Sequence, residues 1–242
     1  MTEKTPSLKE KLESSKKYLP NADLQGADLE GADLAGATLT GSDLRGANLK
    51  KIFLSDSKIS KSNLTGADLT GANLSGADLN KSNLGKANLQ NAYLRRADLR
   101  GANLSETNLT KSNLRECALF KAWFKKSDCS GANMQNIKGA QSKMQGCILV
   151  GAKMAGADLT GARLERANLE DACLQTANLN RAFLNDTNLN RTDLRGANLR
   201  YVAGLTREQV KLARIDKNTL MPDYLKVKWT SQSAFDILDV EK

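Results

Sequence analysis

Residues 67–76 read ADLTGANLSG and contain the same five-residue unit twice, with leucine at the centre of each copy. The same frame runs from Leu24 to Leu199 without a slip, and all but one of its 36 central residues are apolar. An α-helix repeats every 3.6 residues and a strand every two residues. A strict period of five therefore predicts a chain that turns a corner once per unit and builds a solenoid.

Small residues occupy a second fixed position of the unit. The residue two places before each centre is nearly always Ala, Ser, Thr or Cys. We expect the central leucine to point inward and stack on the leucine of the next coil, where it is removed from water. The small side chain beside it then lets the chain turn tightly around a narrow core.

Units 27–31 (ADLEG) and 72–76 (ANLSG) follow the pattern A(D/N)LxG, and the chain resembles the pentapeptide-repeat family over about three-quarters of its length. The resemblance implies an all-β fold, a right-handed quadrilateral parallel β-helix with four units per coil and about nine coils. Each coil would pair its backbone groups with the coils on either side, which leaves only the two ends of the rod open. An open end is a template for aggregation, so we expect short helical caps at both ends.

The sequence divides into three segments. Residues 1–20 are expected to form an N-terminal capping helix, residues 21–200 the β-helix, and residues 201–242 a C-terminal helix with an apolar tail. The tail needs a packing partner, and two alternatives remain. It is a lid on the last coil, or it forms a homodimer contact, which members of the family sometimes make through this end. The apolar residues of the tail are Tyr224, Leu225, Val227, Trp229, Phe235, Ile237, Leu238 and Val240.

Two capping boxes mark the starts of the expected helices. The first, Ser7–Glu10, predicts a helix to about Leu19, and the second, Thr206–Gln209, predicts a helix to about Arg214. The apolar residues expected to anchor these helices are Leu8, Leu12 and Leu19 in the first, and the staple pair Leu205 and Val210 in the second.

Composition and the terminal sequences narrow the class of protein. With 242 residues, of which 40% are apolar, the chain fits one elongated domain and is not intrinsically disordered. Residues 1–20 lack the apolar core of a signal peptide, and no stretch is long enough to span a bilayer. We therefore expect a cytoplasmic protein. Residues 204–225 resemble a segment common after bacterial pentapeptide repeats, which implies a bacterial origin.

Residues suited to catalysis or metal binding are scarce. The chain has no histidine and no CxxC pair, so we expect no zinc site and no cofactor, and the commonest general base is missing. Cys117, Cys129 and Cys147 fall at inward positions, and Cys173 falls at an outward one. Asp and Asn fill 23 of the 36 positions before the centre, where we interpret them as turn formers that stack in ladders. An enzyme is the least favoured class.

The net charge separates the two remaining classes. The family that this chain resembles includes gyrase-targeting members, which imitate DNA with a strongly acidic rod. This chain has a formal net charge of +9, and a basic rod does not present a DNA-like potential. We favour a non-enzymatic interaction or scaffold protein, and keep a topoisomerase (DNA gyrase) modulator or protection protein as the alternative.

One face of the quadrilateral is expected to hold most of the positive excess. A basic stripe of this kind suits phosphates, anionic lipid or an acidic protein, and the alternative interpretation is a solvated face. Its basic residues are Lys58, Lys61, Lys81, Arg100, Lys121, Lys138, Arg181 and Arg200, partly offset by Asp78, Asp98 and Asp158.

The repeat is irregular between residues 124 and 154. Gly139 leaves an inward position empty, and Ile137 places a bulky residue where small ones belong, so we expect the coil to bulge or bend there. The other non-leucine centres of this region are Phe124, Cys129, Met134, Met144 and Met154.

Aromatic and basic residues gather beside this irregular region at positions expected to face outward. Such side chains are common in contact hot spots and on single-stranded nucleic-acid platforms. We expect the partner to be an unknown protein or another anionic macromolecule, with nucleic acid as the less supported choice. Phe53 and Tyr93, two coils apart in one column, are weaker candidates. The candidate partner-binding residues are Phe120, Lys121, Trp123, Lys125, Lys126, Lys138 and Lys143.

Overall fold

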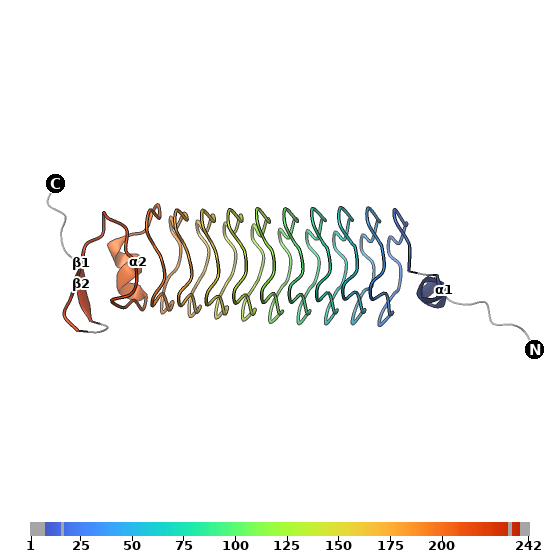
Figure 1. Ribbon diagram of the computed structural model, residues 1–242, viewed down its shortest axis with the longest axis horizontal. Coiled ribbons are helices and arrows are strands. Elements are labelled where there is room, and N and C mark those ends of the chain that lie inside the picture. The colour runs from blue at the N-terminus through green and yellow to red at the C-terminus, as the bar shows by residue number, and fades with distance from the viewer. Residues whose placement is uncertain (1–7, 16, 232–233, 238–242) are drawn as a thin grey trace, which may run out of the picture.

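The computed structural model describes residues 8–15, 17–231 and 234–237, which form a rod with its two ends far apart (Figure 1). Single parallel bridges join residues that are 20 apart, beginning with Tyr18 and Thr38. Twenty residues contain four five-residue units, so each coil of the rod has four faces. The outward residue before each centre forms the bridge, and residues 20 apart therefore lie in one column along the rod.

Backbone hydrogen bonds between coils hold the columns in register. In one example, the Asn88 amide donates to the Ala67 carbonyl at 2.9 Å, and the Leu69 amide donates to the Asn88 carbonyl at 2.7 Å. The same two bonds recur from unit to unit along the rod. The backbone polar groups are thus satisfied by the neighbouring coils, as a solenoid requires.

The core is a stack of leucines flanked by small residues. Central residues such as Leu84 and Leu104 have no exposed surface, and the small inward residues such as Ala87 are buried beside them. This confirms the predicted inward period of five. The last residue of each unit turns the corner with a positive φ, for example 68° at Gly66. Glycine takes this conformation at low cost, which explains its place in the unit.

The Asp and Asn residues before the centres act as the sequence predicts. The Asp68 carboxylate accepts a hydrogen bond from the Thr70 amide at 3.0 Å and closes the corner. Between coils, the Asn108 side chain donates to the Asn88 side chain at 3.1 Å. These side chains therefore stabilise turns and ladders.

The prediction that the coil bulges or bends near Gly139 is wrong. The Lys138 amide bonds the Cys117 carbonyl at 2.9 Å and the Gly139 amide bonds the Asp158 carbonyl at 2.7 Å, so the ladder is unbroken. A Cβ atom placed on Gly139 would lie 3.4 Å from Cδ1 of Ile137 and 3.3 Å from Cδ2 of Leu159. The large and small inward residues have exchanged places in this unit, and Ile137 fills the space that Gly139 leaves.

Helix α1, Leu8–Ser14, precedes the first bridge. It ends earlier than the predicted Leu19, because Tyr18 already pairs with Thr38 and belongs to the first coil. Leu12 is buried, whereas Leu8 is 47% exposed. The two leucines therefore do not form the common buried face that the sequence predicts. Leu19 packs against the core as part of the coil. Ser7, the first residue of the expected capping box, lies outside the described residues.

Helix α2, Arg207–Leu212, follows the last units and has the predicted capping box between Thr206 and Gln209. The Gln209 side chain also donates to the carbonyls of Leu184 and Thr187, at 2.9 and 2.8 Å, which belong to the final coil. The helix ends before the predicted Arg214, because that residue bridges to the column of the rod. The expected staple residues, Leu205 and Val210, are both buried.

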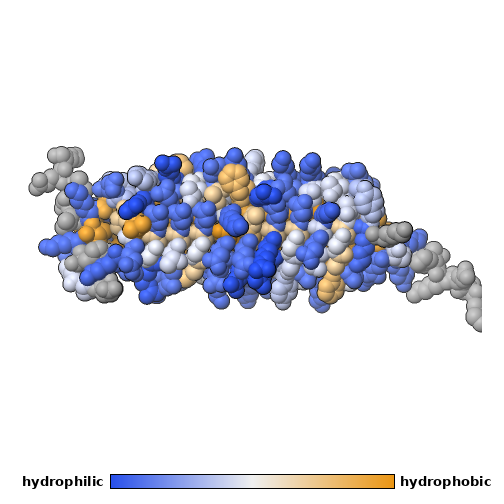
Figure 2. All heavy atoms as spheres, viewed as in Figure 1, coloured by the Kyte–Doolittle hydropathy of each residue, from blue (hydrophilic) through white to orange (hydrophobic). Residues whose placement is uncertain are grey.

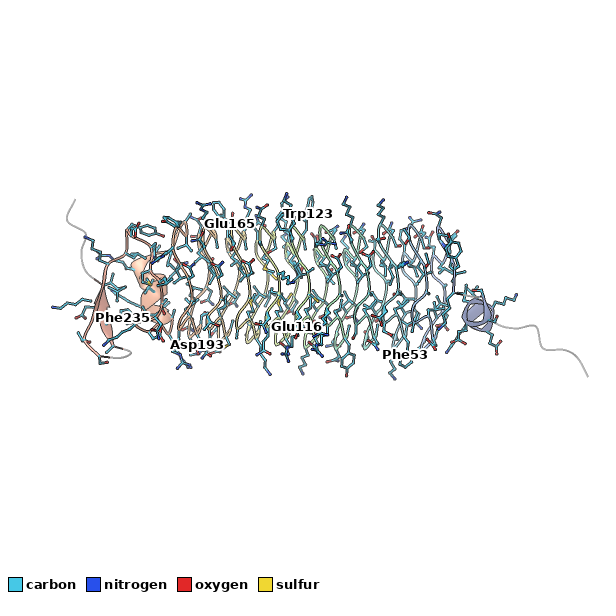
Figure 3. All side chains as sticks on the ribbon, in the orientation of Figure 1. Phe53, Glu116, Trp123, Glu165, Asp193 and Phe235 are labelled. Atoms are coloured by element: carbon cyan, nitrogen blue, oxygen red, sulfur yellow. The ribbon has the colours of Figure 1, made fainter. Side chains whose placement is uncertain are left out.

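The tail folds into an antiparallel hairpin of β1, Val227–Trp229, and β2, Phe235–Ile237. Val227, Phe235 and Ile237 are partly buried against the core, and Figure 3 shows Phe235 at the end of the rod. The Tyr224 hydroxyl donates to the Val202 carbonyl at 3.0 Å. The tail therefore packs on the end of the rod. Leu238 and Val240 lie outside the described residues.

Candidate functional site

The structure divides the candidate residues between two adjacent faces of the rod. Trp123 and Lys143 bridge to each other in one column, and Lys125 and Lys126 follow Trp123 in the same unit. We call this the Trp123 face. Figure 3 shows Trp123 and Glu165 along one edge of the rod, opposite the edge that carries Phe53, Glu116 and Asp193.

Phe120, Lys121 and Lys138 belong to the neighbouring face. Lys138 bridges to Ala118 and Asp158 in the column of that face. Lys121 has a φ of 56° and turns the corner between the two faces. The sequence therefore placed these three residues close to Trp123 along the chain, but the corner directs them to a different side of the rod.

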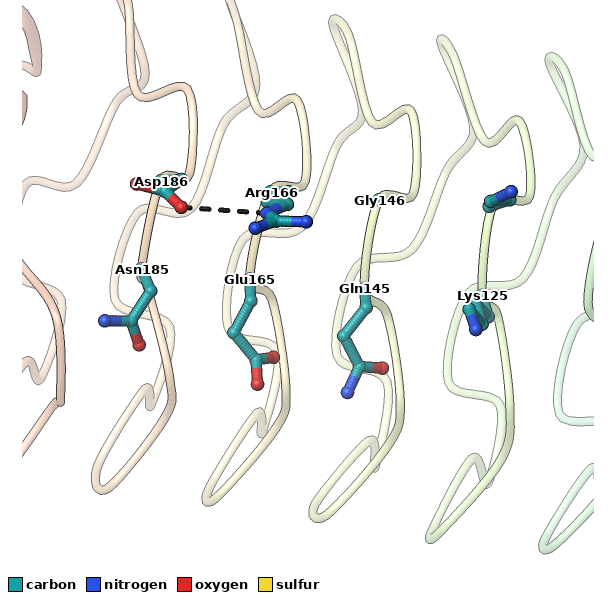
Figure 4. Close-up of a pocket in the computed structure, with 8 residues that line it drawn as sticks. Lys125, Gln145, Gly146, Glu165, Arg166, Asn185 and Asp186 are labelled. Atoms are coloured by element: carbon teal, nitrogen blue, oxygen red, sulfur yellow. Dashed lines mark ion pairs between the residues drawn. The ribbon is translucent and has the colours of Figure 1, made fainter.

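A groove runs along the Trp123 face. Two hollows of about 410 and 400 Å³ lie on either side of the column of Lys125 and Gln145, whose side chains line both, and we call the two hollows together the Trp123 groove. The first hollow lies between the columns before and after the buried centres, and the second lies between the column after the centres and the corner residues that follow it. Figure 4 shows Lys125, Gln145, Glu165 and Asn185 in successive coils. The remaining lining residues are Asn103, Ser105, Trp123, Lys126, Lys143, Gly146, Arg166 and Asp186.

Cations cover the aromatic rings of the column that forms one side of the groove. The Lys143 ammonium lies 4.1 Å from the centroid of the Trp123 ring, and the Arg163 guanidinium lies 5.8 Å from that of Phe183. Trp123 remains 48% exposed. Contacts of this kind stabilise side-chain placement by about 0.5–1 kcal/mol at exposed sites. The Trp123 ring therefore has the Lys143 ammonium on one side and remains half exposed to solvent.

The charges of the groove fall into two halves. Lys125, Lys126 and Lys143, the three groove lysines, form no ion pair with any residue that the structure describes. In the other half, which we call the mixed half, Arg163 pairs with Glu165 at 2.7 Å and Arg166 pairs with Asp186 at 3.7 Å. The dashed line in Figure 4 marks the second pair. The positive charge is thus available at one end of the groove and neutralised at the other.

Sequence reasoning missed the mixed half of the groove. Glu165, Arg166, Asn185 and Asp186 follow the candidate lysines by one to three coils, so they are distant in sequence. The sequence spacing could have revealed them, because residues separated by a multiple of 20 share a column, and Lys125 and Glu165 are 40 residues apart. Counting along columns, rather than along the chain, would have found them.

The face expected to be most basic is partly neutralised. Arg100 binds Asp98 through two side-chain nitrogens, with Nε to Oδ1 at 2.9 Å. Burial alone would raise the pKa of Asp98, but hydrogen bonds from the Arg100 side chain and backbone amide outweigh it and hold this pKa below its usual value. A cation fixed on its own carboxylate is less available to a partner.

Two further features lie on the face opposite the Trp123 face. Phe53 and Tyr93 flank a hollow of about 330 Å³ that also includes Lys51 and Asn73. Farther along, Arg96 and two more arginines surround Glu116, with Arg96 Nε at 2.6 Å. The hydrogen bond from Arg96 is the main cause that lowers the pKa of the Glu116 carboxyl. The three arginines around Glu116 are Arg95, Arg96 and Arg115.

Three of the four cysteines have the environment of core residues, and Cys173 is only partly buried. Cys117, Cys129 and Cys147 are buried, and burial raises the pKa of the Cys117 thiol to about 12. A thiol with such a pKa is a poor nucleophile. The Sγ atoms of Cys129 and Cys147 lie 3.9 Å apart, and both residues are free thiols without a disulfide bond.

Within the described part of the chain, no group of three or more His, Cys, Asp or Glu residues is placed to hold a metal ion. None of its helices has the length and apolar character needed to cross a membrane. Figure 2 shows a mostly hydrophilic surface with apolar groups scattered among polar ones.

The sequence matches the profile of the family "Pentapeptide repeats (8 copies)" over most of the rod. The chain therefore belongs to the pentapeptide-repeat family, whose members are right-handed β-helix solenoids. The matched residues are 19–56, 54–85, 87–125, 102–138, 140–171 and 172–202.

Solved structures of the same family resemble this chain. One is HetL, a pentapeptide repeat protein involved in heterocyst differentiation regulation from the cyanobacterium Nostoc sp. strain PCC 7120. It is 30% identical over 90% of this chain and 98% of HetL, with a TM-score of 0.49. Another is full-length QnrB1, a plasmid-mediated fluoroquinolone resistance protein, which is 13% identical over 77% of this chain and 92% of QnrB1, also with a TM-score of 0.49. No curated protein sequence matches the chain.

Proposed function

We propose that this protein is a non-enzymatic interaction protein that binds an anionic macromolecular partner in the Trp123 groove. One observation carries the proposal: Lys125 and Lys143, which form no ion pair with any described residue, line a hollow of about 410 Å³ together with the exposed Trp123, and Lys126 lies on the adjoining corner. Unpaired cations beside a half-exposed aromatic ring supply both long-range attraction and a stacking surface. Tryptophan is also among the residues most enriched at the energetic centres of interfaces.

The remaining surface and the core support a binding role over catalysis. The interior is filled with leucine and alanine side chains, and the hollows on the rod are open depressions between columns. The chain has no histidine, and the pKa of Cys117 is raised rather than lowered. The formal net charge of +9 disfavours DNA mimicry as the mode of action.

In this proposal the rod is the binding element and the ends protect it. Residues 21–200 form about nine coils, as 36 units in groups of four require. The described residues of the two terminal segments, 8–15 and 17–20 at one end and 201–231 and 234–237 at the other, cover the open ends, which would otherwise pair with other chains. The contacts of Gln209 with the final coil and the partly buried hairpin support a lid at the C-terminal end over a homodimer contact.

A capture experiment with two charge-reversed proteins tests the proposal. The groove variant carries Lys125→Glu, Lys126→Glu and Lys143→Glu. The matched control carries Lys58→Glu, Lys61→Glu and Lys81→Glu on the neighbouring face, and so has the same net charge. Each protein is used to capture partners from a lysate of the source organism, with and without nuclease.

We expect the wild-type protein and the control variant to retain the same partner and the groove variant to lose it. Equal capture by the two variants would contradict a role for the groove. Capture that disappears with nuclease in both the wild-type and control samples would assign the partner to nucleic acid.

A further inference from the structure

The uneven charge of the Trp123 groove restricts the chemistry of its partner. The three groove lysines form no ion pair with a described residue, whereas the mixed half holds two carboxylates, those of Glu165 and Asp186, each paired with an arginine. The Asp186 side chain is 74% exposed and only loosely paired with Arg166 at 3.7 Å. A ligand that lies along the whole groove thus meets unpaired lysines first, and Glu165 and Asp186 with their arginine partners afterwards.

We propose that the Trp123 groove binds an extended polypeptide segment of bipartite charge. Acidic side chains of this segment lie on the three groove lysines, and a hydrogen-bond donor or a basic side chain lies at Glu165 and Asp186. The inference rests on the proposed function, because it names the class of partner for the same groove.

The length of the groove sets the length of the segment. Lys125, Gln145, Glu165 and Asn185 lie in four successive coils. Three steps of about 4.8 Å between coils give about 14 Å. An extended chain advances about 3.3 Å per residue, so about three residues reach from Lys125 to Glu165, two coils away, and about four or five reach from Lys126 to Asp186, three coils away.

Glu165 provides a second and independent indication of a donor in the ligand. Both bonds from Arg163, Nε at 2.9 Å and Nη2 at 2.7 Å, go to Oε1 of Glu165. Oε2 is shielded from solvent and has no hydrogen-bond partner among the residues that the structure describes. A buried polar atom without a partner costs free energy, and the terminal torsion of a glutamate is soft. A small rotation lets this carboxylate accept a donor from a ligand in the groove.

A nucleic-acid strand fits this arrangement less well than a polypeptide. Its phosphates repeat at regular intervals, so those that follow the lysines would meet arginines that are already paired with Glu165 and Asp186, and would gain little attraction there. The Lys143 ammonium also lies over Trp123 at 4.1 Å, so this cation occupies part of the ring surface that a base would need. A polypeptide places acidic and basic groups independently along its length.

Three fluorescent probes distinguish these ligands by anisotropy. The first is a short bipartite peptide with glutamates at one end and lysines about four residues away. The second is a glutamate-only peptide of the same length, and the third is a single-stranded oligothymidylate. Each is titrated into the wild-type protein, into a basic-half variant with Lys125→Glu and Lys126→Glu, and into a mixed-half variant with Glu165→Gln and Asp186→Asn. Thermal melts of all three proteins confirm that they are folded.

We expect the bipartite peptide to bind the wild-type protein more tightly than either polyanion. The basic-half variant should weaken this binding at least about tenfold, because two attractive contacts become repulsive. The mixed-half variant should weaken binding of the bipartite peptide several-fold and strengthen binding of oligothymidylate, because removing the carboxylates has opposite effects on the two ligands.

Two other outcomes overturn separate parts of the argument. If the mixed-half variant strengthens binding of every probe, or if oligothymidylate binds the wild-type protein most tightly, the groove binds a polyanion and the polypeptide inference is wrong. If the basic-half variant leaves the binding of all probes unchanged, the groove is not the binding site and the proposed function fails as well.

Discussion

The exchange of large and small residues at Ile137 and Gly139 yields a quantitative prediction for the core. The side chain of Ile137 is 1% exposed, and its Cδ1 atom reaches the space beside Gly139. Ile137→Ala removes about three carbon atoms, worth about 0.8 kcal/mol each in lost burial, and leaves a cavity that adds to this cost. Because Gly139 has no side chain that could move into the cavity, we expect destabilisation of about 3–4 kcal/mol.

The reciprocal substitution tests whether the two positions compensate. In Gly139→Leu, the first added carbon already lies 3.3 Å from Leu159 and 3.4 Å from Ile137, so the rest of the side chain overpacks the core. The φ of Gly139 lies outside the left-handed region, so the backbone adds no strain. Overpacking of this kind costs about 1–3 kcal/mol. Combining Gly139→Leu with Ile137→Ala restores the usual order of small and large residues, and we expect it to recover nearly wild-type stability.

Denaturant unfolding followed by circular dichroism measures all four proteins of this cycle. The expected interaction energy between the two substitutions is at least about 2 kcal/mol in the stabilising direction. Destabilisations that simply add in the double variant would show that Ile137 does not fill the space beside Gly139. The explanation given above for the unbroken ladder would then be wrong.

Three further predictions concern the core, the surface and pH. Leu84→Lys should prevent folding, because it places an unpaired charge at a position without exposed surface, and its melting curve by circular dichroism should show no cooperative transition. Lys121→Glu combined with Lys138→Glu should change the free energy of unfolding by less than about 1 kcal/mol, since both side chains are on the surface; a larger loss in the same melts would contradict this. Hydrogen bonds from Arg195 lower the pKa of Asp193 to about 2, below its unfolded value. Asp193 should therefore stabilise the fold above pH 4, by about 1–2 kcal/mol after allowance for solvent screening, and lose this effect as the pH falls toward 2. Asp193→Asn should be less stable than wild type at pH 7, and the difference should shrink as the pH falls toward 2; a stability difference that stays constant with pH would refute this assignment.

The period of the sequence carried most of the information about the rod. Every fifth residue had to face inward, because no other regular backbone buries such a pattern, and Leu84 and Leu104 are buried accordingly. The ends were harder to predict. The expected N-terminal helix ran to about Leu19, but pairing of Tyr18 with Thr38 takes that residue into the first coil. Such pairing is a tertiary contact, and a local capping signal does not report it.

The candidate site could be predicted only in part, for a geometric reason. Trp123 and Lys125 were found because aromatic and basic residues cluster near them in the sequence. Phe120 is equally close along the chain but lies beyond a corner, on another face. Glu165 and Asp186 complete the groove from later coils. The depth of the groove depends on the conformations of the long side chains in adjacent columns. Composition alone does not determine these conformations.

The pairing of residues 20 apart lets insertions and deletions act on the surface in two separate ways. Loss or gain of one whole coil before residue 120 would slide the groove along the axis by about 4.8 Å and leave its columns intact. Loss of a single unit would instead rotate everything beyond it by a quarter turn relative to the N-terminal end. During evolution, gain or loss of units can therefore rotate a binding surface around the rod or shift it along the rod. The inward residues on either side of the change keep the same five-residue pattern.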